Sequence, residues 1–129
     1  MFQSNVFDYV NMLDKAADAS WLRNEVIGNN ISNATTPGYK RQDVAFESIL
    51  QRAIHSSRYK STDAKVSSLK TGALAARIYT ENVNYSYRLD KNNVDPDTEG
   101  VFLAENQLKY QGLITAINDE FANLQAAMK

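Results

Sequence analysis

A long stretch with helical periodicity and no interrupting proline occupies the C-terminal end of the chain. Asp95-Pro96-Asp97 has the pattern of a helix start, with Asp at the cap, Pro at the first helical position and Asp in the first turn. Side chains that step by threes and fours then continue to the end, at Leu103, Asn106, Tyr110, Leu113, Ile117, Phe121, Leu124 and Met128. The spacing predicts one helix over residues 95–129, about 50 Å long.

A second helical pattern lies near the N-terminus, over residues 5–34. Asn5 is a suitable cap, and Asp8 falls in the first turn, where the helix dipole favours a negative charge. The apolar positions of this stretch are Val6, Val10, Leu13, Ala17, Trp21, Ile27 and Ile31. We expect this helix, about 40 Å long, to end before Pro37-Gly38, because proline pushes the preceding residue out of the α region.

Helices of this length in a chain of 129 residues need a partner along their length. Both apolar stripes come near a heptad spacing, which predicts that the two helices pair as a coiled-coil-like hairpin. The predicted pairing residues are Leu13, Ala17, Trp21 and Ile27 on the first helix and Leu103, Tyr110, Leu113, Ile117, Phe121 and Leu124 on the second. A two-helix hairpin buries little area, so we expect part of each stripe to face another copy or another protein. A compact single-chain bundle, with the middle folded over the hairpin, is the open alternative.

The middle of the chain has weaker patterns. Residues 43–54 could form another helix, and residues 78–89 are β-branched and aromatic with partial alternation, which favours a strand or a small hairpin. The predicted fold class is mainly α. We expect a single domain over residues 1–129, with a helix at 5–34, a turn and a less regular middle at 35–93, and a helix at 95–129.

The composition excludes most kinds of chemistry. There is no cysteine, so thiolate metal sites and disulfides are ruled out. The one histidine, His55, lies in a polar stretch beside Ser56 and Ser57, and we expect a surface side chain rather than the base of a nucleophilic triad. The five glycines are scattered and form no phosphate-binding loop. No apolar run approaches the roughly 18 residues that span a bilayer. The sequence therefore predicts a protein that is not an enzyme, needs no cofactor or metal, and does not insert into a membrane.

Charge is balanced overall, with 14 basic and 15 acidic residues, but residues 40–70 hold seven basic and three acidic side chains. Tyr39, Tyr59 and Tyr79 lie in or near this stretch. A basic segment with interleaved aromatic residues can bind a nucleic-acid backbone. A solvated face, or a surface that matches the acidic ends of another copy, explains it equally well, so a nucleic-acid-binding module is kept as an alternative and nucleic acid is not expected as a partner.

An unusual asparagine-rich segment ends the N-terminal helix. Asparagine is a poor residue for a helix interior because its amide competes for backbone hydrogen bonds. The candidate assembly motif consists of Asn29, Asn30, Ile31, Asn33, Thr36, Pro37, Gly38 and Tyr39. These residues could form an elaborate helix cap and turn, or a docking surface where chains meet, and spacing alone leaves both open.

The asparagine-rich segment resembles the hallmark of the flagellar basal-body rod and hook protein family, which is close to Ala-Asn-Asn-Ile-Ala-Asn-Ala-x-Thr-Pro-Gly-Tyr. The chain departs from it mildly, at Gly28, Ser32 and Thr35. Residues 88–95 and 105–111, together with the short length, resemble the proximal-rod type in particular. Pro96 and Glu99-Gly100 depart from the usual helix start, and residues 48–87 match nothing in the family.

The resemblance implies a structural subunit of the proximal rod that stacks helically through its terminal helices as part of the drive shaft. The implied partners are copies of itself, other rod proteins, the adapter between the MS ring and the rod, and the export apparatus. It also implies export through the flagellum's own type III secretion channel without a cleaved signal peptide, to a periplasmic site if the cell has an outer membrane. A second proximal-rod protein of similar length is the alternative within the family.

Overall fold

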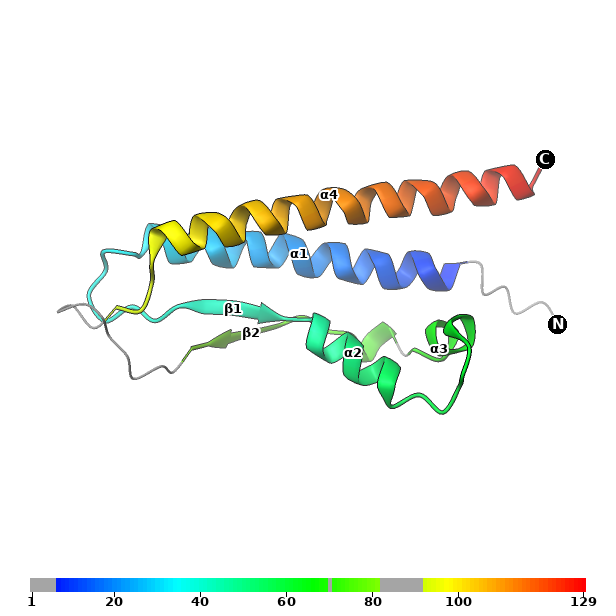
Figure 1. Ribbon diagram of the computed structural model, residues 1–129, viewed down its shortest axis with the longest axis horizontal. Coiled ribbons are helices and arrows are strands. Elements are labelled where there is room, and N and C mark those ends of the chain that lie inside the picture. Colours follow the sequence, from blue (N-terminus) through cyan, green and yellow to red (C-terminus); the bar gives the residue numbers. More distant parts are fainter. Residues whose placement is uncertain (1–6, 70, 82–91) are drawn as a thin grey trace.

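A computed structural model of the chain describes residues 7–69, 71–81 and 92–129. Two long helices, α1 (Asp8–Ser32) and α4 (Pro96–Ala127), lie side by side and run in opposite directions (Figure 1). In Figure 1 the remaining elements lie below α1, and they also contact α4, as in the ion pair of Glu47 with Lys109. This arrangement confirms the predicted fold class, which was mainly α with paired terminal helices.

The ends of the two long helices differ in how well the sequence predicted them. The side chain of Asp95 caps α4 by accepting a hydrogen bond from the backbone N–H of Asp97 at 3.1 Å, as its position before Pro96 predicts. Helix α1 begins at Asp8, later than predicted, after Phe7, whose side chain makes no capping bond. The expected cap Asn5 lies outside the described residues.

The middle segment is more regular than predicted. Strands β1 (Gln42–Ala45) and β2 (Arg77–Thr80) form an antiparallel pair in which Val44 lies opposite Ile78. Between them lie α2 (Glu47–His55), α3 (Thr62–Ser68) and the 3-10 helix η2 (Thr71–Ala73).

Two expectations for the middle segment need correction. The expected helix over residues 43–54 begins only at Glu47, because residues 42–45 pair with β2 instead. The strand expected within residues 78–89 is present at its start, but its partner is β1 rather than a neighbouring strand of a local hairpin. The remainder of that expected hairpin, from residue 82, lies outside the described residues.

The apolar core lies between α1 and the middle segment. Ala19, Phe46 and Leu74 form its buried centre, and partly buried side chains from α2, such as Leu50, pack around them. Helix α4 contributes little to burial, since Glu99 and Asn106 are its two buried residues. Among the residues that the structure describes, no helix combines the length and the apolar character needed to cross a membrane.

Candidate assembly interface

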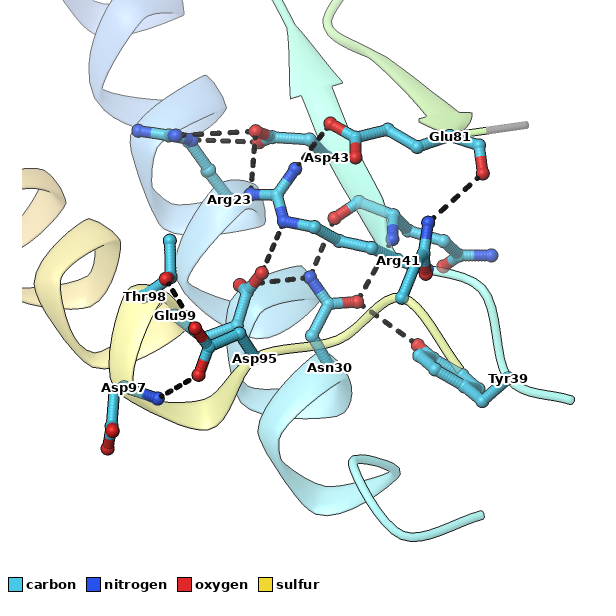
Figure 2. Close-up of polar contacts among 12 residues, drawn as sticks. Arg23, Asn30, Tyr39, Arg41, Asp43, Glu81, Asp95, Asp97, Thr98 and Glu99 are labelled. Carbon is cyan, nitrogen blue, oxygen red and sulfur yellow. Dashed lines mark hydrogen bonds and ion pairs between the residues drawn. The ribbon is translucent and has the colours of Figure 1, made fainter. Parts of the chain in front are cut away.

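The asparagine-rich segment is organised around Asn30, which is fully buried. Its side-chain amide donates to the carbonyl oxygen of Gln42 at 2.7 Å and accepts from the N–H of the same residue at 3.0 Å. It also donates to Glu99 at 3.2 Å and accepts from the hydroxyl of Tyr39 at 3.2 Å (Figure 2). The amide therefore joins α1, the chain after the turn, β1 and α4 at one point.

The rest of the motif forms the end of α1 and the turn that follows. The side chain of Asn33 donates to the carbonyl of Asn29 at 2.8 Å, and the hydroxyl of Thr36 donates to Asn33 at 3.2 Å. Gly38 has φ of +74°, a backbone conformation that favours glycine because it has no Cβ. The cap-and-turn interpretation thus explains most of the motif.

Besides Thr36, whose hydroxyl bonds Asn33, three side chains of the same motif are exposed on the surface. Asn29 and Pro37 are exposed, and Ile31 is 36% exposed although it is a large apolar residue. Because these three side chains are exposed, they remain candidates for contact with another chain.

A buried ion network, which the sequence did not reveal, lies next to Asn30. The guanidinium of Arg41 contacts carboxylates of Glu99, of Glu81 at 2.8 Å and of Asp43 at 3.1 Å, while Arg23 contacts Asp43 at 2.8 Å (Figure 2). Charge-assisted bonds of this kind are stronger than neutral ones and fix orientation.

The same two arginines share an aromatic partner on α4. The guanidinium of Arg41 lies 4.8 Å from the ring centroid of Phe102, and that of Arg23 lies 5.7 Å from it. Both distances are in the range of cation–π attraction. Together with the carboxylates, these contacts hold α1, β1 and the start of α4 in one arrangement.

The network shifts the pKa of its members in opposite directions. Burial raises the pKa of Asp43, but hydrogen bonds from Arg23, from the N–H of Val44 and from Arg41 outweigh it, so the pKa lies below its ordinary value of 3.8. Burial lowers the pKa of Arg41, and its bonds to Glu99 and Asp43 reverse that effect and raise it. Both shifts favour the charged forms, as expected for a paired network.

The lowered pKa of Asp43 leads to a prediction about acid unfolding. Because this carboxyl releases its proton at lower pH in the folded state, its stabilisation is complete above the unfolded value near 3.8 and is lost as the pH falls through the folded value. We expect the free energy of unfolding, measured by urea titration at a series of pH values, to decrease below about pH 4. In an Asp43→Asn chain this decrease should be shallower. An equal decrease in both chains would contradict the assignment.

A second buried asparagine connects the two long helices. The side chain of Asn106, which is 1% exposed, donates to the carbonyl oxygen of Ser20 at 2.8 Å and to the side-chain oxygen of Asn24 at 3.0 Å. A buried polar residue in a helix pair fixes the register, because a shifted pairing would leave it without partners. Asn106 is therefore a register contact between α1 and α4.

The residues predicted to pair the two helices differ in how deeply they are buried. The rings of Trp21 and Tyr110 contact each other across the helix pair, with centroids 5.9 Å apart. Ala17 and Ile27 are buried, and Leu13, Leu103, Leu113, Ile117 and Leu124 are half-buried. Trp21 itself is 58% exposed and Phe121 is 49% exposed. From residue 107 to residue 127, none of the α4 residues is buried.

Two large apolar side chains that the sequence reasoning missed lie on another face of α4. Val101 is 57% exposed and Leu108 is 71% exposed. The spacing of three and four selected the stripe of Leu103 and Tyr110, which was predicted to pack on α1, and Val101 and Leu108 are not part of that stripe. The available signal was the seven-residue spacing of Val101 and Leu108, which places both on one side of a helix.

The basic stretch 40–70 is not a uniform surface. Arg41 is buried in the ion network, so it is not placed to contact a phosphate. Arg58 is exposed and lies 5.5 Å from the ring centroid of Tyr59, and Lys60 is also exposed. In the described parts of the chain, no three or more His, Cys, Asp or Glu side chains are grouped so as to hold a metal ion.

Comparison with known proteins agrees with the sequence resemblance. A family model described as "Flagella basal body rod protein" matches residues 16–40, which cover most of α1 and the turn after it. Flagellar basal body rod protein FlgB of Bacillus subtilis (strain 168) is 32% identical over 127 residues, which cover 92% of each chain. The proteins of the same name from Cereibacter sphaeroides (strain ATCC 17029 / ATH 2.4.9) and Escherichia coli (strain K12) are 36% and 30% identical over 110 and 114 residues, in each case 83% of both chains.

Proposed function

Because this chain belongs to the FlgB family of flagellar basal body rod proteins, we propose that it is a structural subunit of the proximal rod. In this proposal the subunits assemble helically through α1 and α4 and form part of the drive shaft. The role is structural rather than catalytic, and it needs no cofactor. The partners are copies of the chain, other rod proteins, the adapter to the MS ring and the export apparatus, and the chain reaches the rod through the flagellum's own export channel.

The single observation that carries this proposal is the low burial of α4 beyond Asn106. Leu113, Ile117 and Leu124 are only half-buried, and Phe121 is 49% exposed. Burying apolar surface contributes about 25 cal/mol per Å². Neighbouring subunits that cover this surface would therefore supply the stability that the isolated helix pair lacks.

The ion network around Arg41 supports a mechanical role. It ties the helix pair to β1 and β2 through several charged contacts instead of one flexible linker. A subunit in a rotating shaft must resist relative movement of its parts. In this proposal the exposed motif residues Asn29, Ile31 and Pro37 contact the neighbouring subunits.

Substitution of an apolar α4 residue by a charged one tests this function. A Leu113→Asp or Ile117→Asp chain should be made in normal amounts but should fail to enter the rod, because an uncompensated carboxylate at a packed interface is costly. We expect loss of swimming in soft agar and loss of the chain from isolated basal bodies. Asn118→Asp, an exposed position on the same helix, is the matched control and should leave both unchanged. Normal motility of either interface variant would argue against assembly through this face.

A further inference from the structure

A groove with a volume of about 760 Å³ lies between the helix pair and the middle segment. Its walls are mainly apolar, with Ala16 and Ala19 from α1, Leu50 from α2 and Leu113 from α4. Asn106 also lines the groove. The shape and lining suit an apolar side chain or a helix face.

One polar atom in the wall of this groove lacks a partner. The side-chain nitrogen of Asn106 is satisfied by Ser20 and Asn24, but its side-chain oxygen is buried and has no hydrogen-bond partner among the described residues. Buried polar atoms without partners are rare in folded proteins. Because this oxygen is buried, a group that enters the groove cannot reach it, and the match to an occupant rests on the apolar walls.

The charges around the groove are already paired with each other. Lys109 contacts Glu47, and Arg23 contacts Asp43. A charged occupant would have to compete with these contacts. The groove is therefore matched to an uncharged, apolar occupant.

A surface with these properties exists on another face of the same chain. The outer stripe of α4, as we define it, consists of Val101, Ala104, Leu108, Gln111 and Gly112, which lie on one side of the helix. All five are uncharged and exposed, and Leu108 is the most prominent at 71%. Gln111 carries an amide donor, and at Gly112 an added Cβ would meet no atom within 4 Å.

The outer stripe and the groove face different directions on one molecule. Leu108 belongs to the stripe and Lys109 to the groove rim, and successive residues lie about 100° apart around a helix. A molecule therefore cannot insert its own stripe into its own groove. A second copy can do so.

We propose that the groove of one copy receives the outer stripe of α4 from the next copy, with Leu108 against the apolar wall. This inference rests on the proposed rod function and specifies the contact between its subunits. The contact joins two different surfaces, so each added copy presents a new groove or a new stripe. Such a head-to-tail interface does not close on two copies and can extend along a helical array.

Disulfide trapping tests this contact directly, because the chain has no cysteine of its own. The test chain carries Leu108→Cys in the stripe and Ser48→Cys at the exposed rim of the groove. After oxidation of isolated basal bodies, a non-reducing gel should show a ladder at multiples of 14.5 kDa. A chain with Ala122→Cys and Ser48→Cys is the matched control, since Ala122 is exposed but lies about four helical turns from Leu108 along α4, and it should give at least tenfold less ladder.

Each outcome separates this contact from the proposed function. If the chain is present in basal bodies but the ladder does not exceed the Ala122 control, the contact is wrong and the rod function stands. If Ser48→Cys traps a polypeptide of another size, a different rod protein occupies the groove and the proposal is also wrong. If the unmodified chain is absent from basal bodies, the rod function fails, and oxidation of the concentrated purified double-cysteine chain then decides the contact by the same ladder. Dimers from the Leu108→Cys chain alone would indicate a symmetric contact and overturn the head-to-tail arrangement.

Discussion

A Glu99→Ala chain is expected to unfold with a free energy about 3–5 kcal/mol lower than that of the unmodified chain. The carboxylate of Glu99 is 1% exposed and contacts the buried guanidinium of Arg41. Its loss would leave a buried positive charge with weaker compensation, and would also remove an acceptor from Asn30. Breaking one side of a buried ion pair is among the more destabilising single changes, because the remaining charge stays out of water.

Urea titration followed by far-ultraviolet circular dichroism measures this effect. Glu105→Ala removes the same group from an exposed position of the same helix, and it should change the free energy of unfolding by less than about 0.5 kcal/mol. Glu99→Gln should lie between the two, because its amide oxygen can still accept a hydrogen bond without the charge. Equal stabilities of the Glu99→Ala and Glu105→Ala chains would show that the network contributes little.

An Ile27→Ala chain is expected to lose about 2–5 kcal/mol of stability, since the removed methyl and methylene groups leave a cavity. Ile27 has no exposed surface and lies in the C-terminal half of α1. For a chain of this size we expect the midpoint of thermal unfolding to fall by about 8–20 °C.

Ile31→Ala is the matched control for this change, because it makes the same substitution one helical turn later. Ile31 is 36% exposed in the folded chain, so its side chain buries less apolar surface on folding. Its removal therefore costs less and leaves a smaller cavity. Its melting temperature should fall clearly less than that of the Ile27→Ala chain. A larger fall in melting temperature for the Ile31→Ala chain than for the Ile27→Ala chain would mean that Ile31 makes more packing contacts than the structure shows.

The two long helices were predictable because their signals are local. Asp95-Pro96 marks the start of α4 within a few residues, and the spacing of three and four persists to its end. The turn after α1 was likewise predictable from Pro37 and Gly38. The family resemblance in residues 28–39 is confirmed by the relatives that share it.

Contacts between distant parts of the chain were not predictable from periodicity. Residues 42–45 form a strand only because β2, more than thirty positions later, supplies hydrogen-bond partners. The ion network likewise joins Arg41 to Glu81 and to Glu99, and nothing in their spacing indicates proximity. The sequence identified Asn30 as unusual, but its role depends on Gln42 and Glu99 being brought to it.

The contact between α1 and α4 also determines the order in which the chain can fold. Ser20 and Asn106, which meet at the register contact, are separated by 86 positions. Closing a loop of that size costs about 4 kcal/mol in chain entropy, and the interactions that offset this cost are completed last. During synthesis α1 emerges well before its partner α4. The nascent chain therefore lacks the contact between these helices until α4 has been made, and slow synthesis would prolong the period in which the apolar face of α1 is open to other proteins.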